Sequence, residues 1–84
     1  MAVEKSLKAV YEMMNEMLQD TTIPKNIKKA ISEAKQRIEG NDELSVKISA
    51  SIYLLESVSN DVNIPPHART QLWAVMGALE SIKK

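Results

Sequence analysis

The 84-residue sequence predicts an all-α protein, an antiparallel up-and-down four-helix bundle built from two similar helical hairpins. Apolar residues recur at i, i+3, i+4 and i+7 spacing in four separate segments. Only two glycines and three prolines interrupt the chain, and no stretch alternates apolar and polar residues for long enough to predict a strand. Because so short a chain has room for one hydrophobic core, we expect a single four-helix domain over residues 1–84.

The first two helices are expected over residues 3–19 and 24–39. Seven apolar residues of the first lie within an arc of about 120°: Val3, Leu7, Val10, Tyr11, Met14, Met17 and Leu18. The apolar face of the second consists of Ile27, Ala30, Ile31, Ala34 and Ile38. Pro24 is expected as the first residue of the second helix, and Gly40 is expected to end it in the left-handed conformation.

The last two helices are expected over residues 42–59 and from Pro65 or Pro66 to the end of the chain. Asn41 or Asp42 is expected as the N-cap of the third helix because both side chains accept hydrogen bonds from free helical N–H groups. The apolar stripe of the third helix is Leu44, Ile48, Ile52, Leu55 and Val58. The stripe of the fourth is Ala68, Leu72, Val75, Met76, Leu79 and Ile82.

Link length and charge both favour antiparallel neighbours. The links are about 2–6 residues long, which suits adjacent helices that reverse direction. The chain has no net charge, yet residues 1–20, 21–38, 39–64 and 65–84 carry −2, +4, −4 and +2 when Lys and Arg are counted against Asp and Glu. Neighbouring helices therefore meet with opposite charge, which selects pairings more than it stabilises them.

An internal repeat, whose offset places residue 20 on residue 61, supports the two-hairpin prediction. Residues 20–24 match residues 61–65 at an Asp, an Ile and a Pro. The same offset aligns Lys28 with Arg69, Ile31 with Leu72, Ala34 with Val75, Ile38 with Leu79, Leu7 with Ile48, Tyr11 with Ile52 and Met14 with Leu55. We interpret the repeat as two helical hairpins, each with an Asp/Pro turn and an apolar anchor, packed face to face.

Composition excludes several classes of function. The absence of cysteine excludes disulfides, zinc knuckles and thiol catalysis, and a single histidine excludes histidine-rich metal sites, so no metal or cofactor is expected. Zero net charge argues against a dedicated nucleic-acid binder. No apolar run of about 18 residues predicts a membrane span, and the first residues lack the pattern of a signal peptide, so we expect a soluble, cytoplasmic protein.

Two acidic residues and the single histidine lie in the turns. Asp20 and Asp61 occupy equivalent positions and are expected to accept helix N-terminal N–H groups rather than bind metal. His67 is expected in the first turn of the fourth helix, within reach of Asp61 or Asn63, where a local structural role is favoured. Catalysis is the weaker alternative, since no nucleophile, glycine-rich loop or carboxylate cluster accompanies the histidine. No catalytic residue is predicted.

The second helix carries a basic face composed of Lys25, Lys28, Lys29 and Lys35. Lysines on one face can contact a phosphate backbone through salt-dependent, sequence-independent attraction. The alternative is a solvated outer face, which the lack of interleaved aromatic residues favours.

The third and fourth helices have few charges on the side opposite their core stripes. A helix that is low in charge on both sides is usually covered on both sides, and Trp and Tyr are enriched at interfaces. We therefore expect a partner or dimer surface made of Val46, Ala50, Tyr53, Arg69, Thr70, Trp73, Ala74, Gly77 and Ser81. Arg69 is one turn before Trp73 and could stack on its indole ring. The alternative is that this side is buried within the chain itself.

Two runs of the sequence resemble a known family. The run Asn-Asp…Pro-x-His-Ala-Arg-Thr…Trp at residues 60–73 and the run Asp-x-x-Ile-Pro-Lys-Asn-Ile-Lys-Lys-Ala at residues 20–30 are similar to an archaeal uncharacterised protein family of the UPF series, number 0147. The resemblance extends over about residues 7–80, with Ile64 where the family more often has Met. It implies a small all-helical protein of archaea without an assigned activity, and it carries over no catalytic residues.

These observations favour a non-catalytic interaction or scaffold protein whose partner is itself, as a homodimer, through the third and fourth helices. Another protein is a possible second partner, and no membrane partner is expected. The first alternative is a nucleic-acid or ribonucleoprotein accessory factor that uses the basic face of the second helix. The second alternative is an enzyme, which no group of residues in the sequence supports.

Overall fold

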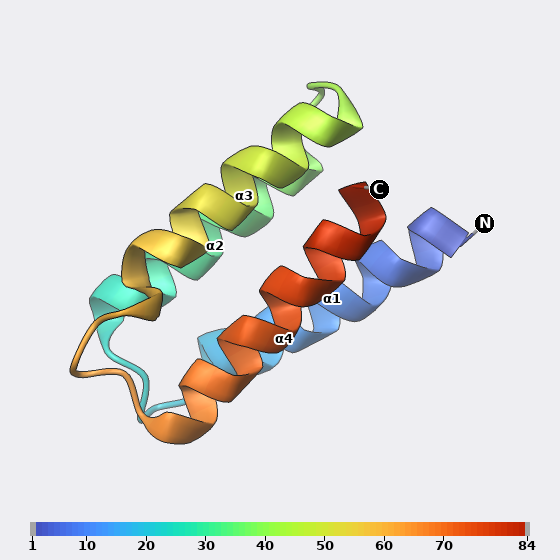
Figure 1. Ribbon diagram of the computed structural model, residues 1–84. Helices are drawn as coiled ribbons and strands as arrows, with labels where there is room; N and C mark the ends of the chain where they lie inside the picture. The colour runs from blue at the N-terminus through green and yellow to red at the C-terminus, as the bar shows by residue number, and fades with distance from the viewer. Residues whose placement is uncertain (1, 84) are drawn as a thin grey trace.

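The protein consists of four helices joined by short turns (Figure 1). The structure is a computed structural model that describes the backbone of residues 2–83 and the side chains of residues 5–83. The helices are α1 (Ala2–Gln19), α2 (Lys25–Glu39), α3 (Leu44–Ser59) and α4 (Pro66–Lys83). No strand occurs within residues 2–83. The all-α prediction is confirmed, and each expected helix lies within about two residues of its predicted bounds.

The helices are arranged so that each contacts two others. Contacts join α1 to α2, α2 to α3, α3 to α4 and α4 to α1, whereas among the described residues the pairs α1–α3 and α2–α4 have no Cα atoms within 8 Å. The turns at residues 20–24 and 60–65 lie at one end of the molecule, and the turn at residues 40–43 and both chain termini lie at the other (Figure 1). The Cα atoms extend over 34 × 19 × 18 Å.

The predicted apolar stripes meet in a single core. Each helix contributes residues at i, i+3, i+4 and i+7 spacing, and the two turns contribute one isoleucine each. The buried apolar residues are Val10, Met14, Met17, Ile23, Ile27, Ala30, Ile31, Ala34, Ile38, Ile48, Ile52, Leu55, Ile64, Ala68, Leu72, Val75 and Leu79. Leu7, Tyr11, Leu18, Leu44, Val58, Met76 and Ile82 pack against this core and are partly buried. The side chain of Val3 is outside the described residues.

Two polar side chains that were not predicted to be buried, Ser51 and Ser59, are buried among the described residues. Ser51 is fully buried on α3, where its Oγ lies 2.8 Å from the carbonyl oxygen of Ala34 on α2 and 2.9 Å from that of Lys47 in its own helix. A buried hydroxyl needs such partners, because an unsatisfied one costs about 1–3 kcal/mol. Ser51 therefore provides a polar contact between two helices in an otherwise apolar layer.

The helix ends differ from the predictions at three positions. Pro24 is the N-cap of α2 rather than its first residue, and α3 is capped by Glu43 instead of Asn41 or Asp42, without a side-chain hydrogen bond. Gly40 has φ −73° and ψ −178°, so the left-handed conformation expected there is wrong. Its N–H donates to the carbonyl of Arg37, three residues earlier, at 3.2 Å. This i→i−3 hydrogen bond ends α2 without a residue of positive φ.

Within residues 2–83, no helix combines the length and the apolar composition needed to cross a membrane.

Candidate interaction surface and the paired turns

The turns at residues 20–24 and 60–65 have the same hydrogen bonds at positions that the internal repeat aligns. Asp20 Oδ1 accepts the backbone N–H of Thr22 at 2.8 Å, and Asp61 Oδ1 accepts the backbone N–H of Asn63 at 2.8 Å. Each aspartate thus closes a turn with the residue two positions on, which is a common use of Asp in turns. The predicted bonds to helix N-terminal N–H groups are replaced by these bonds within the turns.

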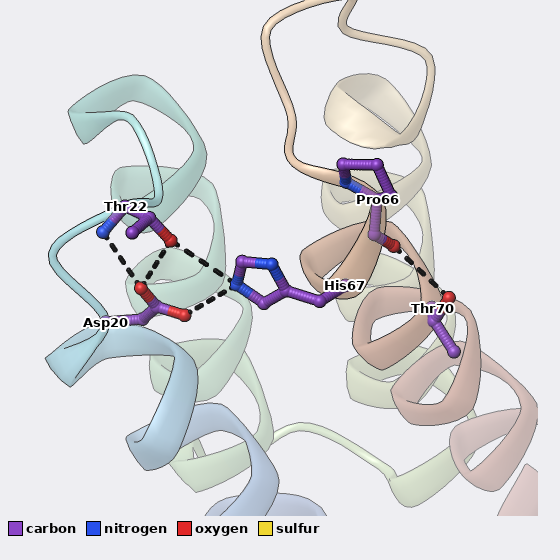
Figure 2. Close-up of polar contacts among 5 residues, drawn as sticks. All are labelled: Asp20, Thr22, Pro66, His67 and Thr70. Carbon is purple, nitrogen blue, oxygen red and sulfur yellow. Dashed lines mark hydrogen bonds and ion pairs between the residues drawn. The ribbon is translucent and has the colours of Figure 1, made fainter.

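Each turn is also linked to the helix that follows the other turn. His67 Nε2, at the start of α4, lies 2.8 Å from Asp20 Oδ2 and 3.3 Å from Thr22 Oγ1 (Figure 2). Asn26 Nδ2, at the start of α2, donates to Asp61 Oδ2 at 3.0 Å. The offset that aligns Asp20 with Asp61 also aligns Asn26 with His67, so the two contacts are equivalent in the repeat. They tie the two hairpins together at one end of the molecule.

The position of His67 corrects one expectation. Its partner is Asp20 of the distant turn rather than Asp61 or Asn63 of the adjacent one. Figure 2 shows the His67 ring at the start of α4 pointing to Asp20 and Thr22 of the turn that follows α1. The structural role expected for His67 therefore includes a contact between distant parts of the chain, which the local sequence could not indicate.

The hydrogen bonds of the turns lower the pKa values of both aspartates. The Thr22 side chain, the Thr22 backbone N–H and the side chain of His67 stabilise the Asp20 carboxylate and lower its pKa to about 2. The backbone N–H of Asn63 and the side chain of Asn26 lower the pKa of Asp61. Both effects follow from donors that favour the ionised carboxylate. The two carboxylates are therefore charged in the folded protein at neutral pH.

The geometry around His67 suits a structural link better than catalysis. One nitrogen, Nε2, faces both Asp20 and Thr22, while the Thr22 hydroxyl donates to Asp20 Oδ1. In a nucleophile–base–carboxylate relay, the two partners occupy opposite nitrogens of the ring. Among the described residues, no group of three or more His, Asp or Glu side chains could hold a metal ion.

The second feature is the outward side of α3 and α4, which we name the α3/α4 surface. It consists of Val46, Ala50 and Tyr53 on α3 and of Thr70, Trp73, Ala74, Gly77 and Ser81 on α4.

The large side chains of this surface are open to solvent in the single chain. Tyr53 is 74% exposed, Trp73 59% and Val46 53%. They are three of the four large apolar side chains that are exposed within residues 5–83, and the fourth is Val62 in the 60–65 turn. The alternative that this side of the helices is buried within the chain is therefore wrong for these residues. Ala50 is half-buried, and the small residues of α4 on this surface are exposed.

Nothing in the single chain requires a glycine at residue 77. A Cβ atom built at this position would meet no heavy atom within 4 Å. Glycine inside an exposed helix costs about 1 kcal/mol relative to alanine, so neither the backbone nor the packing of the single chain requires it. A glycine without an intramolecular cause is consistent with a second helix that approaches α4 closely at residue 77.

A groove of about 560 Å³ opens between α3 and α4 beside this surface. Its lining is Ser49, Ile52, Tyr53, Glu56, Glu80 and Lys83. Sequence reasoning did not single out the groove because it depends on how the two helices pack. In the internal repeat, the position equivalent to Ile52 is occupied by Tyr11, whose larger ring packs against the core between α1 and α2.

Two predicted members of the interaction surface form bonds within the chain. Arg69 is half-buried, and its Nη2 donates to the carbonyl of Asp61 at 3.3 Å, so its guanidinium is directed to the turn. The Thr70 hydroxyl donates to the carbonyl of Pro66 at 3.2 Å, as Figure 2 shows. Arg69 is for this reason omitted from the α3/α4 surface.

The predicted basic face of α2 is only partly free. Lys25 and Lys29 are exposed, Lys28 is half-buried, and Lys35 Nζ donates to Asn15 Oδ1 of α1 at 2.9 Å. The four lysines therefore do not form a uniform set of phosphate contacts, because one of them links α2 to α1.

Comparison with known proteins places the chain in a family. A family model described as "Uncharacterised protein family (UPF0147)" matches residues 1–82. The chain belongs to this family. The UPF0147 protein MJ1419 of Methanocaldococcus jannaschii is 40% identical over 82 residues, which cover 95% of this chain and 87% of that protein. The UPF0147 protein of Archaeoglobus fulgidus is 35% identical over 79 residues, with 94% and 91% coverage.

Two crystal structures are similar to this UPF0147 chain. A protein of the family from Thermoplasma acidophilum has a TM-score of 0.90 at 30% identity and covers 98% of this chain and 99% of its own. A protein of unknown function, MMP1188, has a TM-score of 0.89 at 39% identity, with 94% and 91% coverage. The family resemblance predicted from the sequence is confirmed, and the relatives are mostly archaeal. Their descriptions name no activity, ligand or partner.

Proposed function

We propose that this UPF0147 protein is a non-catalytic interaction protein that associates with a second copy of itself through the α3/α4 surface. We further infer that its helices form an antiparallel up-and-down bundle of two similar hairpins and that it acts in the cytoplasm. The observation that carries the proposal is the exposure of Tyr53, Trp73 and Val46, which lie opposite the core stripes of α3 and α4.

The character of this surface supports association. Trp and Tyr are among the residue types most enriched at interface hot spots, and this surface exposes one of each. On the outward face of α4, Thr70, Ala74, Gly77 and Ser81 are small and uncharged, so a second helix can approach that face without displacing long side chains, while Arg69 and Glu80 flank it. Gly77 adds to this argument. A glycine at this position lowers the stability of the single chain, and the close approach of another surface would explain its presence.

The size of the molecule is compatible with a stable dimer. One long side measures 34 by 19 Å between Cα atoms, an area of about 650 Å² before side-chain relief is added. A stable interface buries about 800 Å² of accessible surface on each partner. The flat area is about four-fifths of that value and side-chain relief adds to it, so a dimer would have to use nearly the whole side.

Sedimentation equilibrium of the full chain tests the proposal at protein concentrations from one to several hundred micromolar. We expect a monomer–dimer equilibrium for the wild type and a monomer for the double variant Trp73→Ala with Gly77→Glu, which removes the aromatic contact and places a charge at the closest approach. Val62→Ala is the matched control because it removes an exposed apolar side chain outside the surface. A wild type that remains monomeric at the highest concentration would refute the proposal.

A further inference from the structure

The α3/α4 side of the molecule has an exposed indole ring on α4 and a groove between the two helices. Trp73 lies in the first half of α4 and is 59% exposed. The groove is lined by Glu80 and Lys83 near the end of α4 and by Ser49, Ile52, Tyr53 and Glu56 along α3. At 1.5 Å per residue, residues 73 and 80 are about 10 Å apart along the helix axis. Gly77 lies between them.

A two-fold axis through Gly77 would bring the Trp73 ring of one copy to the Glu80 and Lys83 end of the groove in the other copy. When two copies of α4 cross in antiparallel directions at residue 77, residue 73 of one copy lies opposite residue 81 of the other, which is next to Glu80 at the edge of the groove. The close approach that the crossing requires is available because a Cβ at residue 77 would have no neighbour within 4 Å. Self-complementarity of this kind is what a symmetric dimer interface requires.

We propose that, in the dimer, the indole of Trp73 from each copy occupies the groove between α3 and α4 of the other copy. This inference rests on the proposed self-association and specifies how it occurs. The groove of about 560 Å³ offers Ile52 and the Tyr53 ring as apolar walls. A tryptophan buries about 150–250 Å² when it is covered, so the two exchanged rings supply a substantial part of the roughly 1,600 Å² of a standard interface.

Polar groups of the groove complement the indole. The Trp side chain has one N–H donor and no acceptor, and a buried indole normally finds a hydrogen-bond acceptor. Glu56 and Glu80 supply carboxylate oxygens in the groove lining. Neither forms an ion pair within 4.0 Å among the described residues, so these carboxylates are available to accept the N–H of the incoming ring.

The first hairpin differs from the second at positions equivalent to those around the groove. On the other side of the molecule, Tyr11 is at the position equivalent to Ile52 and packs against the core, and Lys35 bonds to Asn15 across α1 and α2 at 2.9 Å. The equivalents of Lys35 and Asn15 are Met76 and Glu56, which cannot form that bond. The inference therefore predicts one interface for each copy and a closed dimer instead of a chain of copies.

The fluorescence of Trp73 tests the inference because the protein has a single tryptophan. We expect the emission of the wild type to shift to shorter wavelength as the concentration is raised through the dimerisation range measured by sedimentation. Ser49→Arg and Ser49→Tyr fill the groove by charge and by size, and each is expected to weaken dimerisation at least about tenfold and to abolish the shift. Gln36→Arg on the exposed side of α2 is the control for added charge.

A mixing experiment separates the exchange from other modes of association. Ser49→Arg has its tryptophan but a blocked groove, and Trp73→Ala has an open groove but no tryptophan. We expect the blue shift to reappear only when the two variants are mixed, since the mixed dimer restores one exchange, and circular dichroism confirms that each variant is helical.

If the wild type dimerises while its emission remains that of an exposed indole, or if the mixture shows no recovery, the exchange is wrong although self-association stands. A monomeric wild type overturns both proposals.

Discussion

The substitution Gly77→Ala is expected to stabilise the single chain and to weaken its self-association. In the folded chain, the new methyl group meets no heavy atom within 4 Å, so it introduces no clash. Because residue 77 is in the interior of an exposed helix, the change should raise the free energy of unfolding by about 0.8–1.0 kcal/mol. For a domain of this size, that corresponds to an increase in Tm of about 4–8 °C.

Urea unfolding, followed by circular dichroism at a concentration where sedimentation shows a monomer, measures this gain. Ala74→Gly is the matched control because Ala74 is exposed in the same helix one turn away. We expect it to lower the free energy of unfolding by a similar amount, and the variant with both changes to be near the wild type. Gly40→Ala should bring no such gain, since a Cβ there would lie 3.3 Å from the carbonyl oxygen of Arg37.

Gly77→Ala should weaken association although it stabilises the monomer. This weakening distinguishes a residue in the proposed interface from one that merely tolerates substitution. A methyl group at the closest approach of two helices separates them, so the dissociation constant of Gly77→Ala should rise while its monomer becomes more stable. A substitution that is neutral or destabilising in the dilute monomer would show that the space at residue 77 is not open in the folded chain. That result would refute the structural reasoning whatever the oligomeric state.

Four further predictions follow from the turns, the core and the charge pattern. His67→Ala removes one donor and should raise the pKa of Asp20 from about 2 toward 3.8, which carboxyl NMR titration measures. Because the folded-state pKa values of Asp20 and Asp61 are lowered, both carboxylates contribute stability above the ordinary pKa of 3.8. The contribution of Asp20 should be lost as the pH falls from there toward about 2, and that of Asp61 as the pH falls below 3.8, so urea midpoints should decrease in this acid range and stay constant from pH 5 to 7. Ser51→Ala should lower the free energy of unfolding by about 1 kcal/mol in urea titrations, because the hydroxyl contact with Ala34 is lost, and an unchanged midpoint would contradict that role. A low-salt titration of labelled RNA should show no binding at micromolar protein, whereas binding that weakens steeply with salt would favour the alternative of a phosphate-contacting basic face on α2.

Local sequence patterns predicted the helices well because a helix is formed by bonds between residues four apart. The apolar stripe of α2, from Ile27 to Ile38, is buried throughout. The turns were located by Asp20 and Asp61 together with the prolines that follow them. Helix ends were harder to predict. Several residues near each end can act as a cap, and the competition between Glu43 and Asp42 is decided by the path of the incoming chain.

The internal repeat relates more positions than the turns and the apolar anchors. The offset that aligns Asp20 with Asp61 also aligns Asn26 with His67. That second alignment indicates that the residues at the start of α2 and α4 have equivalent partners. It could not indicate that each partner lies in the opposite turn, since this depends on how the hairpins face one another.

The sequence alone determined the all-α class, the position of each helix, the apolar stripes and the membership of the UPF0147 family. These properties depend on residue periodicity and on runs of residues that are adjacent in the chain. Only the tertiary structure decided that His67 meets Asp20, that Ser51 is buried against Ala34, and that Trp73 and Tyr53 are exposed beside a groove. Periodicity shows which side of a helix is apolar, but the neighbours of the other side depend on the positions of whole helices, which are set by the packing of the entire core.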